Sequence, residues 1–383
     1  MIKSNTQSEL NNFFQVRDQT EIPFQKVSAS AFCQARKKFS ASAFIELNQV
    51  ATECFYNLAT IEKWQGFRVL AVDGVKYHLP DEKVIRRAFG GQGNQHVEEF
   101  PMALGSALYD VFQKVIIDAQ LFPYRSSERD IAYQHLAAIQ AGDLVLYDRG
   151  YPAFWLFAAH EACQRDYCMR VKANFNQEVS EFVASGKKQQ VVTLKPTETA
   201  KQKCQENGLS YEPQTVRLIR VKVKKKTYIL VTSLLDTARY RIADFKVLYH
   251  KRWEIEEGYK RQKSWLEIEN FTGKSVLSVE QDYHARILSL NLIAITVFVA
   301  KHQYLNEPVN RRYCYQINFA QALSTMKDTL VKLLYGLDSS HSLIRLLKTL
   351  SQGLTAIRPG RSFERKKQGS GQKKFKPCYK RAM

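Results

Sequence analysis

Residues 67–79 read FRVLAVDGVKYHL and come directly after a helical N-terminal stretch. Apolar and β-branched residues lead here to the pair Asp73–Gly74, and the spacing changes from a helical period to a period of two. This pattern predicts a β-strand that ends at Asp73, where an Asp-Gly pair favours a turn. The rest of the predicted fold extends from this strand.

The segments that follow predict a mixed sheet with helices on its faces. In order they are a pair of strands at 102–122 that turns near Asp110, a helix at 128–139, a strand at Leu144–Tyr147, a helix at Ala153–Cys163 and a strand at Tyr167–Val171. Strands that alternate with helices in this way are typical of an α/β fold.

The sequence on either side of these strands, and a long segment after them, predicts four further regions: two helical regions, an insertion and a C-terminal tail. Residues 1–65 are helical in pattern and include CQARKKF, a basic stretch that could contact DNA or could be a solvated surface. Residues 173–240 contain alternating runs such as TVRLIRVKV, which predict a β-rich insertion. Residues 276–357 return to a helical pattern. Residues 358–383 are rich in Lys, Gly and Ser, and we expect this tail to be disordered when unbound.

The charge balance indicates a polyanionic partner. The chain has 57 Lys and Arg against 37 Asp and Glu, a formal charge of +20, and the tail from Arg358 accounts for +9 of it. The remaining +11 belongs to the body of the chain, which favours nucleic acid as the partner. The N-terminus lacks an apolar signal sequence, and the apolar run Ile287–Ala300 is short for a membrane span. We therefore expect a cytoplasmic protein that associates with the nucleoid when bound.

Two Asp residues follow apolar strands and predict a metal site. Asp73 and Asp148 each precede a Gly within two residues, which lets the backbone turn and a phosphate approach. Carboxylates are the ligands that Mg²⁺ and Mn²⁺ prefer, and two such ions can activate an attacking oxygen and stabilise a leaving one. The alternative for Asp148 is a helix cap after a strand.

A third carboxylate lies in LYHKRWEIEEGYKRQKSW, residues 248–265. Tyr249, Arg252, Glu256 and Lys263 are separated by 3, 4 and 7 positions, so on a continuous helix they share one face. One acid among phosphate-binding donors suits a phosphodiester site. The alternative is an exposed helix with i,i+4 ion pairs.

The motif Y-x-x-R-x-x-x-E-x-x-x-x-x-x-K at these four positions resembles the signature of DDE transposases of bacterial insertion sequences, in the insertion sequence four family. Asp73–Gly74 matches the family's first motif, and Asp148, Gly150 and Phe154 match its second, D-x-G-x-x-x-Y/F. The three motifs occur in the family's order.

The resemblance implies an RNase H-like core over residues 66–275, with the insertion at 173–240 inside it. It implies that Asp73, Asp148 and Glu256 are the catalytic residues and hold two Mg²⁺ or Mn²⁺ ions, and that Tyr249, Arg252 and Lys263 bind DNA. It also implies cut-and-paste transposition by a homodimer on double-stranded DNA, without NTP and without a membrane. The alternatives are a DNA-binding protein that has lost the chemistry of a transposase, or an RNase H-like nuclease or resolvase.

Overall fold

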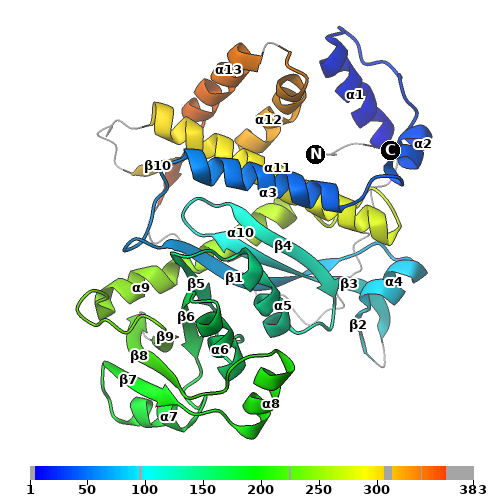
Figure 1. Cartoon of the computed structure of the whole chain (residues 1–383). Coiled ribbons are helices and arrows are strands. Elements are labelled where there is room, and N and C mark those ends of the chain that lie inside the picture. The colour runs from blue at the N-terminus through cyan, green and yellow to red at the C-terminus, as the bar shows by residue number, and fades with distance from the viewer. Residues whose placement is uncertain (1–4, 95–96, 224–225, 306–312, 338, 359–383) are drawn as a thin grey trace. The chain divides into compact units, whose positions relative to one another are not determined.

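The computed structural model covers the whole chain, and the structure describes residues 5–94, 97–223, 226–305, 313–337 and 339–358 (Figure 1). The chain divides into two compact units whose segments alternate along the sequence. One unit combines residues 58–77 and 103–260, and the other combines 1–57, 78–102 and 261–383.

The first unit is built on a mixed sheet whose central part has the strand order β4-β3-β1-β5-β6. The strands are β1 (Arg68–His78), β3 (Val97–Asp110), β4 (Ile116–Pro123), β5 (Asp143–Tyr147) and β6 (Asp166–Val171). Strands β1, β5 and β6 are parallel, whereas β3 and β4 form an antiparallel hairpin. Helix α5 (Glu128–His135) connects β4 to β5, and α6 (Phe154–Ala162) connects β5 to β6. This order is RNase H-like, so the predicted α/β fold class is confirmed.

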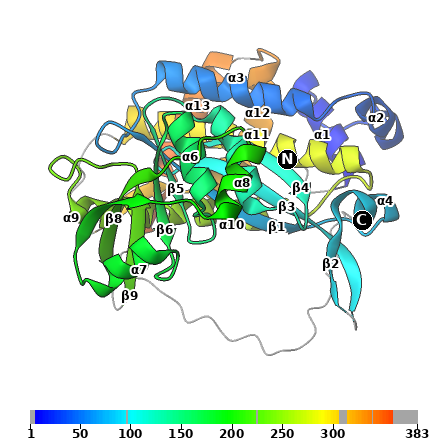
Figure 2. The same cartoon turned by 60° about the horizontal axis from the view of Figure 1, so that its bottom comes forward.

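The chain between β6 and the last helices of this unit extends the sheet by three antiparallel strands. They are β7 (Gln189–Leu194), β8 (Gln214–Val223) and β9 (Lys226–Thr232), in the order β6-β9-β8-β7. Two helices accompany them, α7 (Gln177–Ala184) and α8 (Glu198–Glu206), and α8 packs against α6 (Figure 2). The segment predicted as a β-rich insertion therefore continues the central sheet. Its helix α8 was not predicted, because its apolar positions are few.

The core of this unit lies on both faces of the central strands. All five residues of β5 are buried, as are the first five of β1. Apolar side chains from the strands and from α6 form one continuous cluster, which includes Leu70, Val72, Val145, Tyr147, Phe157, Met169, Leu218 and Val231. Burial on both faces explains why these strands read as nearly continuous apolar runs.

A buried ion pair joins the first residues of β1 and β5. Arg68 donates from Nε and Nη2 to the two carboxylate oxygens of Asp143, at 2.7 and 2.6 Å. The two residues are also register partners in the parallel ladder. Because the pairing is bidentate and buried, a shift of β1 against β5 would leave both charges without a partner.

The second unit is mostly helical, and it contains two short strand pairs. Its helices are α1 (Thr6–Asp18), α2 (Ala29–Arg36), α3 (Ser42–Leu58), α4 (Lys83–Phe89), α11 (Val276–Tyr304), α12 (Phe319–Leu334) and α13 (Ser339–Gln352). Strand β2 (Gly91–Asn94) pairs with the start of β3, and β10 (Cys314–Ile317) pairs with β11 (Leu354–Ile357). The β10–β11 pair lies in a stretch that was predicted to be helical; its partners are distant in sequence, so no local pattern indicates it.

Helix α11 organises this unit. The Asn291 amide donates to Asn48 Oδ1 of α3 at 2.7 Å, and Phe298 packs edge-on against Phe55. Arg36, from the basic CQARKKF stretch, pairs with Asp282 of α11 at 2.7 Å. Arg36 therefore stabilises packing inside the unit, and of this stretch Lys37 and Lys38 stay exposed.

Within the described residues, α11 is the helix whose length and composition would allow it to cross a membrane, and core helices of soluble proteins meet the same criterion. Ile287, Leu290, Ile293, Ala294 and Ala300 are buried, in agreement with the predicted core helix at Ile287–Ala300. The predicted basic tail lies, apart from Arg358, outside the described residues.

The ion pair at the start of β1 makes a testable prediction. Arg68→Leu leaves the Asp143 carboxylate buried without its partner and should lower the free energy of unfolding by about 3–5 kcal/mol. The double variant Arg68→Leu/Asp143→Leu should recover much of this loss, because no charge is left unpaired. Urea unfolding of the three proteins measures both effects. Equal stability of the single and double variants would show that the pair does not couple the strands.

Candidate active site

The parallel register of the central strands places three charged residues side by side. Val72 is paired with Tyr147, so Asp73 on β1 and Asp148 after β5 occupy adjacent positions. Tyr147 is paired with Met169, so Arg170 on β6 is adjacent to Asp148. Neighbouring strands lie about 4.8 Å apart, which brings both carboxylates within reach of a shared ligand. The structure thus brings together two of the predicted site residues.

Asp73 lies within its strand, which corrects the prediction that β1 ends there. The strand continues to His78, because β-branched and aromatic residues resume after Gly74. The Asp73 carboxylate is one-fifth exposed. Its pKa is raised to about 6, mainly by burial and to a smaller extent by the carboxylates of Glu256 and Glu128, while Arg252 and the Gly74 amide oppose the change.

The segment that carries the third carboxylate consists of two helices rather than one. Helix α9 (Ile242–Lys251) ends at Arg252, and α10 (Trp253–Ser264) begins at the next residue. The amide of Arg252 bonds to the Tyr249 carbonyl, and the Ile255 amide bonds to the Arg252 carbonyl, both three residues apart. The predicted single helix is therefore interrupted at Arg252, where the bonds are of the 3₁₀ type, but Arg252 keeps right-handed helical backbone angles and its i,i+4 contact with Glu256.

Arg252 joins the carboxylates of the site. Its Nη2 donates to Glu256 Oε1 at 2.9 Å, and its Nη1 lies 3.8 Å from Asp73 Oδ2. Burial disfavours its charge, yet its pKa is raised because Tyr249 and the carboxylates of Asp148, Glu256 and Asp73 favour the charged form. One buried guanidinium thus lies among Asp73, Asp148 and Glu256 and offsets part of their mutual repulsion.

The other two residues of the motif make structural contacts. Tyr249 is buried, and its hydroxyl donates to the carbonyl of Tyr147 at 3.1 Å, which ties α9 to the end of β5 next to Asp148. Lys263 lies in the last turn of α10, and its Nζ is 3.1 Å from Glu269 Oε1. Their predicted contacts with DNA stay predictions.

Arg170 was not singled out from the sequence. Its Nη1 lies 3.8 Å from Asp148 Oδ1, and its guanidinium lies 4.1 Å from the centre of the Tyr228 ring on β9. A cation held beside a strand-end carboxylate can bind a phosphate oxygen. The signal in the sequence was a single Arg near the end of the apolar strand YCMRV.

Glu128 adds a fourth carboxylate beside Asp73. A side chain at position 74 would meet Glu128 Oε1 at 3.1 Å, so this carboxylate lies against the Asp73–Gly74 backbone. Glu128 is the first residue of α5, and Ser127 caps that helix by accepting a bond from the Asp130 amide. The sequence predicts only a helix start in this region, since the proximity of Glu128 to Asp73 depends on how α5 packs.

A buried polar row supports β1 behind the site. Ser106 Oγ lies 3.4 Å from the Asp73 carbonyl and 2.9 Å from His135 Nε2, and His135 Nδ1 lies 2.7 Å from Asp118 Oδ2. The order Ser-His-Asp resembles a nucleophile with its base, but Ser106 is only 2% exposed and could not reach a substrate. We assign this row a structural role, because it joins β3, β4 and α5.

The carboxylates have the chemistry of a divalent metal site. Asp73, Asp148 and Glu256 offer hard oxygen donors, as Mg²⁺ prefers. Across the residues that the structure describes, no three His, Cys, Asp or Glu side chains are gathered closely enough to hold a metal ion. In this arrangement the Arg252 guanidinium is the positive charge among the three carboxylates. Their oxygen donors fit a divalent metal.

The polar row makes a testable prediction about stability. His135 lowers the pKa of Asp118, although burial alone would raise it. Asp118→Asn removes the ionised acceptor and should cost about 1–3 kcal/mol at pH 7. Because the folded pKa is depressed, the difference should shrink as the pH falls through that pKa. Thermal unfolding measures it, with Asp130→Asn on the exposed side of α5 as the control. Equal losses in both variants would contradict a specific role for Asp118.

Comparison with known proteins shows which family the chain belongs to. The family described as "Transposase DDE domain" matches residues 64–292, more than half of the chain. The transposase InsG for insertion sequence element IS4, from Escherichia coli K12, is 28% identical over 272 residues, which cover 70% of this chain. The match spans 60% of the length of InsG.

Among solved structures, the piggyBac transposase synaptic complex with hairpin DNA aligns at a TM-score of 0.43 with 11% identity. The alignment covers 77% of this chain and 59% of that one. Because the family model matches more than half of the chain, this chain belongs to the family of proteins with a transposase DDE domain.

Proposed function

We propose that this chain is a DNA transposase of the cut-and-paste type. It hydrolyses a phosphodiester at each end of a transposable element and then joins the freed 3′-OH to target DNA. The observation that carries this proposal is the register that sets Asp73 beside Asp148, together with Arg252, which links Glu256 to both.

Asp73, Asp148 and Glu256 would hold the divalent metal, for which we propose two Mg²⁺ or Mn²⁺ ions. When bound, such ions activate an attacking oxygen and stabilise a leaving one. The protein's own cations have a separate task. Arg252 and Arg170 lie within 4 Å of these carboxylates and would orient the phosphate oxygens. Tyr249 holds α9 on the end of β5, and so keeps the arginine in place.

The proposed partners are the double-stranded ends of the element and the target DNA. The excess of twenty positive charges supports this. We assign the helical region 1–65 and Lys263 to DNA contact and the core 66–275 to the chemistry, and we propose a homodimer on paired ends. We also propose a cytoplasmic location, where the DNA of a bacterial cell is found.

The test uses the purified chain, DNA that carries its gene with native flanks, and Mg²⁺ or Mn²⁺, with breaks mapped to the nucleotide. We expect metal-dependent breaks at matching inverted ends. Asp73→Asn, Asp148→Asn and Glu256→Gln should each abolish the breaks and leave DNA binding intact, because a neutral isostere loses the ligand charge but keeps the shape. Glu257→Gln is the matched control, since Glu257 is partly exposed on the same helix and pairs with Lys260.

Breaks that persist in all three carboxylate variants would refute the assigned site. Tight binding of the ends by the unaltered chain without any breaks would favour a DNA-binding protein that has lost the chemistry. Breaks without joining to a second DNA would favour a nuclease or resolvase.

Because the carboxylates lie close together, we also expect the ionised site to lower the free energy of unfolding. The pKa of Asp73 rises from 3.8 to about 6, so ionising it costs more in the folded chain than in the unfolded chain. Asp73→Asn should therefore stabilise the metal-free chain, by up to about 3 kcal/mol at pH 8, at about 1.4 kcal/mol per pKa unit. The gain should shrink as the pH falls from 6 toward 4. Unfolding with a chelator present measures it. A variant less stable than the parent at pH 8 would contradict the prediction.

A further inference from the structure

The Glu128 carboxylate lies beside Asp73 but outside the group of charges that Arg252 joins. Its Oε1 and Cδ atoms are each 3.1 Å from the position that a side-chain carbon would take at residue 74, so it contacts the backbone directly after Asp73. Arg252 pairs with Glu256 and lies 3.8 Å from Asp73, and within the described part of the chain Glu128 forms no ion pair. Two carboxylates are therefore close together, and the second has no cation paired with it there.

Gly74 leaves the space that Glu128 occupies. It lies in the interior of β1 and its φ is not positive, so the backbone conformation does not require a glycine. A glycine inside a strand weakens the strand, and it often marks a point where another group approaches closely. A methyl group at this position would lie 3.1 Å from Glu128 and 3.3 Å from Leu104 Cδ1. Glycine is therefore needed here for the approach of the carboxylate.

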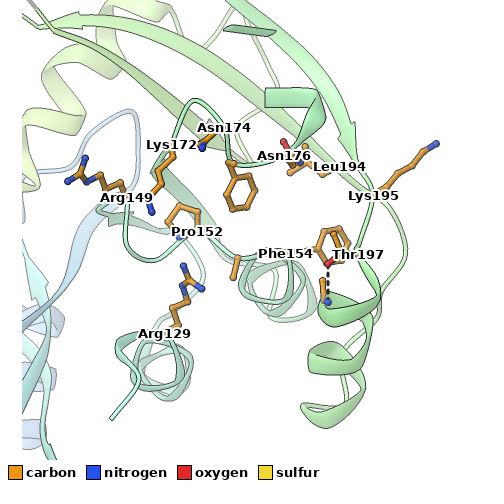
Figure 3. A pocket seen from close by; sticks show the side chains of 13 residues that line it. Arg129, Arg149, Pro152, Phe154, Lys172, Asn174, Asn176, Leu194, Lys195 and Thr197 are labelled. Carbon is orange, nitrogen blue, oxygen red and sulfur yellow. Dashed lines mark hydrogen bonds between the residues drawn. The ribbon is translucent and has the colours of Figure 1, made fainter. Parts of the chain in front are cut away.

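The first turn of α5 is attached to the loop that follows β5. Arg129 Nε donates to the Gly150 carbonyl at 2.9 Å. Figure 3 shows the Arg129 side chain directed from its helix toward Pro152 in the same loop. Because Glu128 precedes Arg129 and Tyr151 follows Gly150, this bond holds the carboxylate and the tyrosine next to each other.

Tyr151 contributes a buried polar atom to this place. The residue is 2% exposed, and its hydroxyl has no well-formed hydrogen bond to any of the described residues. Its ring lies 5.4 Å from the ring of Tyr147 in the core. Burial raises the pKa of Tyr151, and the charges of Asp73 and Glu128 act in the same direction, so the hydroxyl is near both carboxylates. A buried donor without an acceptor is unfavourable, which indicates that it acquires one when the site is filled.

The chemistry of these groups favours a divalent cation over any anion. Two neighbouring carboxylates repel each other, and a cation between them removes the repulsion. A phosphate or a carboxylate ligand would add to it. Mg²⁺ is commonly held by one or two protein carboxylates, together with waters and the phosphates of a substrate. Asp73 and Glu128 therefore suffice as the protein's ligands for one ion.

We propose that Glu128 belongs to the metal site as a fourth carboxylate, and that it holds one divalent cation together with Asp73. Tyr151 is a positioning residue, whose hydroxyl donates to the Glu128 carboxylate and keeps it directed at Asp73. The use of this cation in DNA cleavage rests on the proposed function. Its binding needs no DNA, so the two proposals are tested by different measurements.

The experiment titrates the DNA-free chain with Mn²⁺ and measures the unbound ion by its electron paramagnetic resonance signal. Glu128→Gln should weaken Mn²⁺ binding by roughly 10- to 100-fold, and Tyr151→Phe by about 10-fold, in the range found when a metal site loses a supporting group. The matched control is Asp130→Asn, which removes the same charge from the same helix, where Asp130 is exposed and lies 3.7 Å from Lys203. The control should keep the parent's affinity.

The glycine has its own test. Gly74→Ala should displace the Glu128 carboxylate and weaken Mn²⁺ binding to a similar extent. Adding Glu128→Gln to Gly74→Ala should cause little further loss, because both changes remove the same ligand. Unfolding with a chelator present checks the fold of each variant. Tyr151→Phe should be no less stable than the parent, since the hydroxyl has no hydrogen bond to lose among the described residues.

Equal Mn²⁺ affinity of Glu128→Gln and the parent, or an equal loss in Asp130→Asn, would overturn the proposal, and so would a parent that binds no Mn²⁺. If Glu128→Gln loses Mn²⁺ binding and the parent does not cleave DNA, the cation site stands and the proposed function falls. If the parent cleaves DNA and Glu128→Gln binds Mn²⁺ as the parent does, the proposed function stands and the fourth carboxylate falls.

Discussion

The register between β1 and β5 is the constraint on which the site depends. Arg68 and Asp143 are paired at the start of these strands, and five positions later the same register brings Asp73 beside Asp148. A slip of one residue would turn one of these carboxylates to the opposite face of the sheet. The ion pair at one end of the strands and the two carboxylates Asp73 and Asp148 at the other are therefore coupled through the apolar residues between them, all of which are buried.

The charges at the two ends serve opposite purposes. Asp143 has a bidentate partner and stabilises the fold, whereas Asp73 shares Arg252 with Glu256 and Asp148 and has a raised pKa. One guanidinium cannot neutralise three carboxylates, and Glu128 adds to the repulsion. This residual negative charge is what a site for divalent cations requires. Arg252 lies between α9 and α10, and from there its side chain contacts Glu256 at i,i+4 spacing and approaches Asp73.

The positions of the cations in the fold are more informative than their number, because some of them are engaged in ion pairs within the chain. Arg36 is engaged with Asp282 in the helical unit, and Arg68 with Asp143 in the sheet unit, so neither is available to DNA. By contrast, Arg170 and Arg252 lie beside the carboxylates of the candidate site, 3.8 Å from Asp148 and from Asp73 respectively. A basic composition thus predicts a polyanionic partner, and the ion pairs show which cations are engaged within the chain itself.

The sequence by itself determined the strands that carry Asp73 and Asp148, the i,i+4 spacing of Arg252 and Glu256, and the α/β class, because these follow from local periodicity and turn chemistry. The tertiary structure alone decided the parallel register, the break between α9 and α10, and the approach of Arg170 and Glu128 to the site. It also decided the pairing of β10 with β11. These features depend on contacts between residues far apart in the chain, such as the 75 positions between Arg68 and Asp143. A local pattern does not report such contacts, since it records which face of an element is apolar and not which element covers it.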